Sequence, residues 1–146
     1  VYDRLTAARE PGKRTTGHAL FPFNPMLLGA GPMPQHLFLA PGEATVDEMI
    51  ASTERGIYVT RHWYTRMVHP RDAIVTGMTR DGTFFIENGE LAYPIKNLRF
   101  TQSYVQALAG VEMIGRETRL MGDWAGSTCA PALKLRSFLF TGATEF

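Results

Sequence analysis

The sequence predicts an α+β domain with mostly antiparallel strand pairing, in which a strongly twisted or barrel-like sheet carries two helices. The first indication is the Asn88-Gly89 pair between two strand-like runs, because this dipeptide favours a two-residue hairpin turn. The second is a pair of helix starts, at Thr45 and Ser103. The third is composition: 146 residues with 45% hydrophobic and 20% charged residues are typical of one globular domain with a real core.

The clearest predicted helix covers residues 44–55. Thr45 can cap it, and Glu48 three residues later completes a capping box. Gly56 stands where a helix C-terminus favours glycine. Its apolar stripe has helical spacing and consists of Val46, Met49, Ile50 and Thr53. A second helix is expected from Ser103, with Gln106 in the capping-box place and Gly115 as its end.

The remaining chain predicts about six or seven strands and their connections. The hairpin 83–87 and 90–93 is the strongest of these signals, and Pro94 then indicates an edge or a bend. Leu133, Leu135 and Leu139 alternate with polar or aromatic neighbours, which favours a final half-buried strand. The other expectations are strands at 57–60, 73–78 and 99–101, a break at Pro70, a turn at 79–82 and a Gly-rich loop at 123–128.

Charge and cysteine content exclude several classes of protein. Fifteen Lys and Arg against 14 Asp and Glu leave a net charge of +1, which gives no electrostatic reason to expect a nucleic-acid partner. One cysteine cannot form an internal disulfide framework, so nothing points to secretion, and we expect a cytoplasmic protein. No targeting segment is recognised at Val1, and the sequence reads as a mature or truncated chain.

The segment from His18 to Gly42 lacks charged residues over 25 positions, long enough to span a bilayer. It holds five of the nine prolines, however, and each proline costs a helix interior about 3 kcal/mol. We therefore expect no membrane span. The segment is interpreted as an extended stretch that covers a protein surface or lines a groove.

Few residues carry a chemical signature. The histidines are too widely spaced for a helical zinc pair and are interpreted as surface or hydrogen-bonded structural residues: His18, His36, His62 and His69. The carboxylates are scattered, and neither a phosphate loop nor a Gly-x-Ser-x-Gly elbow occurs. Cys129, in a loop of small residues, could be a nucleophile or a soft metal ligand, or simply a small buried apolar residue.

The order of segments resembles the C-terminal domain of the TldD/PmbA family, historically labelled modulator of DNA gyrase. The resemblance runs from about Thr15 to Phe146. Its most specific pieces are Glu54-Arg55-Gly56-Ile57-Tyr58-Val59, Ile86-Glu87-Asn88-Gly89-Glu90-Leu91 followed by Tyr93-Pro94-Ile95-Lys96, and Cys129 in its glycine-bearing loop.

The resemblance implies a zinc metallopeptidase system that cleaves unfolded or leader peptides, working as a homo- or heterodimer of family homologues. In the family a His-Glu-x-x-x-His helix upstream of this region supplies metal ligands, and Cys129 corresponds to a further ligand. That motif is absent from this sequence. The chain is therefore expected to be a fragment of a longer protein, with no catalytic residue of its own, zinc as a shared cofactor and Cys129 as its metal ligand.

Two other functions stay open. The parent protein could be a PmbA-like subunit without a metal motif that supports a catalytic partner. The old family label suggests a DNA-binding modulator of gyrase, against which the charge of +1 speaks.

Overall fold

The computed structural model describes residues 1–19, 31–34, 36–123 and 126–143. The chain divides into two compact units, one formed by 1–40 with 119–130 and the other by 41–118 with 131–146. Residues 20–30 and 35 of the predicted extended segment 18–42 lie outside the described residues. No helix in the described ranges is long and apolar enough to cross a membrane.

The first unit contains the short helix α1 (Arg4–Arg9) and strand β1 (His36–Phe38). Asp3 caps α1 because its side chain accepts a hydrogen bond from the Thr6 amide at 2.6 Å. Strand β1 pairs in parallel with β7 (Gly126–Leu135), and the order β1-β7-β6, with β6 spanning Val111–Asp123, makes a three-stranded sheet.

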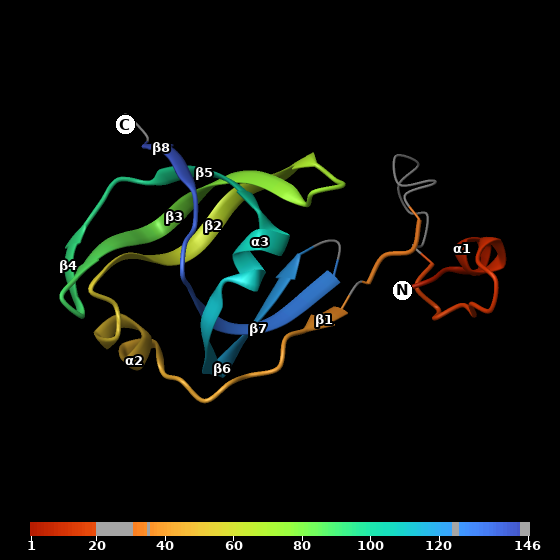
Figure 1. The fold of residues 1–146 in the computed structure, drawn as a ribbon, viewed down its shortest axis with the longest axis horizontal. Coiled ribbons are helices and arrows are strands. Elements are labelled where there is room, and N and C mark those ends of the chain that lie inside the picture. Colours follow the sequence, from red (N-terminus) through yellow and green to blue (C-terminus); the bar gives the residue numbers. More distant parts are fainter. Residues whose placement is uncertain (20–30, 35, 124–125, 144–146) are drawn as a thin grey trace. The chain divides into compact units, whose positions relative to one another are not determined.

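The second unit is built on a five-stranded antiparallel sheet. Its order is β2-β3-β5-β8, and β4 also pairs with β3 (Figure 1). The strands are β2 (Arg55–His69), β3 (Ile74–Glu87), β4 (Glu90–Pro94), β5 (Leu98–Ser103) and β8 (Phe140–Ala143). Helices α2 (Val46–Ala51) and α3 (Tyr104–Ala109), residues 111–118 of β6 and residues 131–135 of β7 also belong to this unit. The α+β class and the antiparallel pairing are thus confirmed, whereas the sheets are open rather than barrel-like, and the described residues form three short helices instead of two.

Two local predictions are confirmed in detail. Thr45 and Glu48 form a reciprocal capping box at the start of α2. Asn88 and Gly89 both have positive φ, at 52° and 81°, as a type I′ turn requires. The turn also supplies hydrogen-bond donors to carbonyl groups of the chain after α2. The Asn88 and Gly89 amides donate to the Glu54 and Thr53 carbonyls at 2.7 and 3.0 Å.

Four further predictions were wrong, and pairing between strands distant in the chain explains the first three. Residues 79–82 are not a turn but lie within β3, where positive φ at Asp81 and Gly82 accompanies a bulge against β2. The second helix ends at Gly110, and residues up to Gly115 belong to β6. Cys129 lies in β7 rather than in a loop. The alternation predicted for 133–139 does not hold, because β7 ends at Leu135 and Leu139 is 58% exposed.

The core of the second unit lies on one face of its sheet. Phe100 on β5 is fully buried and packs over Gly77 of β3, where a Cβ atom would come within 2.7 Å of the phenylalanine ring. The rings of His62, Phe138 and Phe140 continue this cluster, with neighbouring centroids 4.7 to 5.5 Å apart.

Candidate functional site

Cys129 lies in the middle strand of the three-stranded sheet. Its Cα atom is in register with that of Phe38 on β1, and its carbonyl accepts a hydrogen bond from the Leu39 amide at 2.9 Å. The small residues around it predicted a loop, but parallel pairing with β1 draws them into a strand. The cysteine is half-buried and makes no disulfide.

One face of this strand pair carries the groups that can do chemistry. Residues in register share a face of a sheet and alternate along each strand, so His36 and Phe38 lie on the same face as Ser127 and Cys129. The His36 Nδ1 atom lies 2.8 Å from the Ser127 hydroxyl oxygen, which confirms that these two side chains meet. A thiol and an imidazole are therefore placed on one face, two residues apart along the paired strands.

These residues do not complete a metal site by themselves. A structural zinc needs four protein ligands and a catalytic zinc commonly three. Within the described residues, no group of three or more His, Cys, Asp and Glu side chains gathers in a way that could hold a metal ion. Cys129 can thus supply one soft ligand, and a zinc site would need the others from residues outside the described part of this chain.

The other histidines are held by local partners. His18 Nδ1 lies 2.8 Å from the Thr16 hydroxyl, and His69 Nδ1 lies 3.0 Å from an Asp72 carboxylate oxygen. His62 keeps part of its surface in solvent, but its ring lies among phenylalanines, and this partial burial lowers its pKa. These contacts agree with a structural interpretation of all three.

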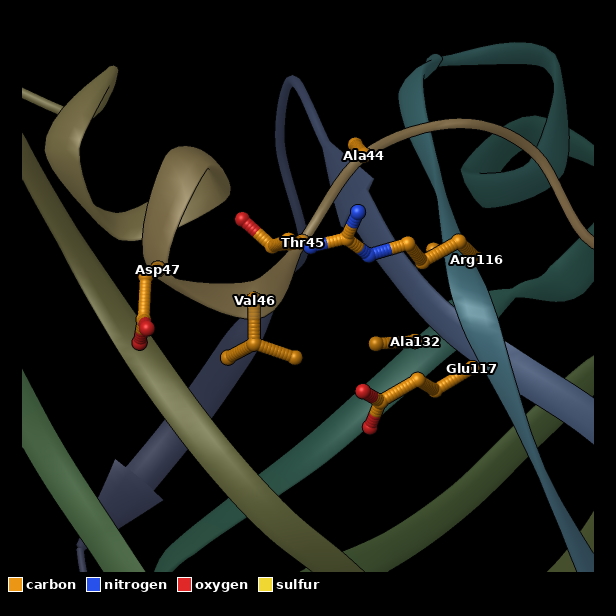
Figure 2. A pocket seen from close by; sticks show the side chains of 8 residues that line it. Ala44, Thr45, Val46, Asp47, Arg116, Glu117 and Ala132 are labelled. Carbon is orange, nitrogen blue, oxygen red and sulfur yellow. The ribbon is translucent and has the colours of Figure 1, made fainter.

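A surface pocket of about 310 Å³ lies in the second unit, between the start of α2 and strand β6. Figure 2 shows Arg116 and Glu117 projecting from β6 beside the first turn of α2. The pocket is lined by Ala44, Thr45, Val46, Asp47, Gly115, Arg116, Glu117 and Ala132. Sequence reasoning missed Arg116 and Glu117, because it ended a helix at Gly115 where the structure has a strand.

Backbone pairing fixes the walls of this pocket. The Gly42 amide donates to the Gly115 carbonyl at 2.9 Å, and the Arg116 amide donates to the Ala44 carbonyl at 2.8 Å. Gly42 is required there, since a Cβ atom would lie 2.5 Å from the Ile114 carbonyl oxygen. The lining combines one guanidinium, two carboxylates and the Thr45 hydroxyl, and it contains no histidine, cysteine, serine or lysine, which makes it a polar hollow.

The pKa of Glu48, whose carboxylate accepts hydrogen bonds from the pocket residue Thr45, is lowered from its ordinary value. The main cause is the hydrogen bond from the Thr45 amide, followed by the bond from the Thr45 hydroxyl, with a smaller contribution from the Arg116 charge. The carboxylate is therefore ionised at neutral pH and stabilises the N-terminal turn of α2.

The fold and these sites define an open-sheet α+β domain with a half-buried thiol and a polar pocket. The family model described as the PmbA/TldA metallopeptidase C-terminal domain matches residues 1–142, and the chain belongs to this family. No curated protein matches the chain.

Several solved chains share the fold. The crystal structure of TldE from Thermococcus kodakarensis superposes with a TM-score of 0.58 at 16% identity, over 72% of this chain. A protein from Thermotoga maritima, named as a candidate modulator of a DNA gyrase, superposes with a TM-score of 0.74 at 20% identity, over 96% of this chain. The matched part is 23% and 30% of those two chains, so this chain spans about a quarter to a third of their length.

Proposed function

We propose that this chain is the C-terminal domain of a TldD/PmbA-type zinc metallopeptidase system that cleaves unfolded or leader peptides. Cys129 contributes one ligand to a metal site whose His-Glu-x-x-x-His helix is encoded outside this sequence. The family match over residues 1–142 carries the proposal. The half-buried thiol of Cys129, which shares a face with His36, agrees with a ligand role.

The strand beside the thiol offers a means of holding a peptide. Within the described residues β1 pairs only with β7, so its other edge is open. Leu37 and Phe38 on this strand are 52% and 70% exposed. An extended substrate can add to such an edge through backbone hydrogen bonds, while the apolar side chains of β1 contact the side chains of the substrate. Only β1 would then lie between the added strand and Cys129.

Zinc content tests the ligand role directly. The full-length protein that contains this chain is purified as wild type and as Cys129→Ser, and its zinc is measured by elemental analysis. The variant is expected to lose most of the metal, because a hydroxyl is a far poorer zinc ligand than a thiolate. Ser127→Ala, a change on the same face of β7, is the matched control and should keep the metal. Equal zinc in wild type and Cys129→Ser would refute the ligand role.

A PmbA-like partner subunit is the second candidate. The likeness in fold to TldE is the observation that supports it. In this case the protein joins a motif-bearing homologue in a heterodimer and holds no metal. Cleavage of an unstructured peptide by the purified full-length protein alone supports the first candidate. Cleavage only after a homologue is added supports the second. Under either candidate we infer a cytoplasmic protein.

A further inference from the structure

Four arginines lie on one face of the β2-β3-β5 sheet. Arg61 is in register with Arg80, and the Cα partners of Arg66 and Arg99 are β3 residues that alternate with Arg80 on the same face. All four arginines are exposed. This basic face, defined by Arg61, Arg66, Arg80 and Arg99, is the side of the sheet opposite the Phe100 core.

Two of these arginines are held in place by a tryptophan and a carboxylate. The guanidinium carbons of Arg61 and Arg80 lie 5.1 and 5.4 Å from the Trp63 ring centroid. Asp81 accepts from Arg61 at 2.7 Å and lies 3.7 Å from Arg80. Because these contacts order the side chains beforehand, a partner that binds them loses less conformational freedom. Asp81 offsets only part of the positive charge.

The neighbouring edge of β2 has no partner strand among the described residues. Strand β2 has 15 residues and, within the described part of the chain, pairs only with β3. Residues 60–69 are all exposed, and Tyr64, Met67 and Val68 among them are each more than half exposed. This length of strand presents backbone N–H and C=O groups, with apolar side chains beside them. Such an edge is a template for another polypeptide strand.

We propose that the free edge of β2 takes up an extended acidic polypeptide segment as an added strand. Adjacent strands lie about 4.8 Å apart, so carboxylates on alternate residues of the added strand reach Arg61 and Arg66. Arg80 and Arg99 lie on strands further in and contribute the surrounding positive field. A nucleic acid would also meet the arginines, but it cannot pair with the strand edge. The open backbone therefore favours a polypeptide. The inference shares no residue with the β1 and β7 site and stands apart from the proposed peptidase function.

The first test measures charge selectivity. The probe is a fluorescein-labelled peptide of about ten residues with alternating Glu and Val, long enough to cover the exposed part of β2. Fluorescence anisotropy with the purified full chain should show binding that weakens with added salt, and much weaker binding of the matching Lys and Val peptide. Equal affinity for the two peptides would overturn the proposal.

The second test locates the contact. Arg66→Gln should weaken binding of the acidic peptide about fivefold, the effect of one exposed charge pair, and Arg66→Lys should restore most of it. Arg119→Gln, which removes an exposed arginine on β6, should leave the affinity unchanged. Circular dichroism confirms that each variant is folded. Weakening by Arg119→Gln equal to that by Arg66→Gln would show only a general charge effect and would contradict the assignment.

The third test separates strand addition from simple charge attraction. The acidic peptide is synthesised with N-methyl groups on alternate residues, which keep its charge but remove the backbone donors along one edge. Binding should fall at least tenfold for the isomer methylated on the edge that faces β2. Undiminished binding of both methylated isomers would refute strand addition. The labelled peptide is also displaced with oligothymidylate and with unlabelled acidic peptide. If oligothymidylate displaces it at the lower concentration, nucleic acid is the favoured partner and the choice of a polypeptide is overturned.

Discussion

Replacing Thr79 by valine should be the most informative perturbation of the core, because the hydroxyl removed accepts two hydrogen bonds. Thr79 is fully buried on β3. Its oxygen accepts from the Thr83 hydroxyl at 2.7 Å and from the Leu98 amide at 2.9 Å. Valine keeps the shape of threonine but leaves both donors without this acceptor.

The size of the effect follows from the cost of unsatisfied groups. A buried donor without a partner costs about 1–3 kcal/mol; Thr79→Val leaves two such donors, of which the Leu98 amide is only part-buried, so it should lower the free energy of unfolding by about 2–4 kcal/mol. Thr83→Val removes only a donor, since the Thr79 oxygen keeps its bond from Leu98. Its cost should be about 1 kcal/mol or less. Thr79→Ser keeps the acceptor and loses one methyl group, at about 1 kcal/mol.

Urea denaturation of the full chain, followed by circular dichroism, measures all three variants. With an m-value of about 2 kcal/mol/M, Thr79→Val should shift the midpoint down by about 1–2 M without changing m. If Thr79→Val unfolds within about 0.5 kcal/mol of wild type, or if Thr83→Val is the costlier change, the reasoning from unsatisfied donors is wrong.

Three further changes test other parts of the second unit. Burial lowers the pKa of His62, so the fold should lose stability as the pH falls below the ordinary imidazole value of 6.5, and His62→Phe should reduce this loss when denaturation is compared at pH 7 and pH 5. A stability difference between His62→Phe and wild type that does not change with pH would contradict this role of His62. Gly89→Ala should cost more than 1 kcal/mol in thermal unfolding, because φ is +81° and a Cβ atom would lie 2.7 Å from a carbonyl oxygen of α2, whereas Gly142→Ala, with open space around it, should be nearly neutral. Thr45→Ala should cost about 1 kcal/mol by removing the cap from α2, and unchanged stability would show that the capping box with Glu48 contributes little.

The features that were predicted correctly are those with short-range causes. The capping box of Thr45 and Glu48 joins residues three apart, and the Asn88-Gly89 turn is set by two adjacent residues. The same reasoning failed at Ser103. This residue holds the N-cap position of α3, yet its hydroxyl donates to the Asp72 carbonyl instead of capping the helix.

In the candidate site too, the residue type was read from the sequence, whereas its position depends on residues distant in the chain. Cys129 was identified from the sequence as the residue that could carry chemistry, but its place in a central strand beside Phe38 depends on pairing across 91 positions. Arg116 and Glu117 became pocket residues because β6 pairs with the chain at Ala44, through the bridge between Ala44 and Gly115. No local pattern contains that information.

The amino-acid sequence by itself determined the α+β class, the first turn of α2, the hairpin turn and the presence of one thiol, because each depends on residue type and spacing within a few positions. Only the tertiary structure decided the length of β2, the continuation of β3 through 79–82, and which charged side chains share a face. Strand pairing joins residues far apart in the chain, and the backbone hydrogen bonds and buried surface gained there outweigh weak local preferences for turn or helix.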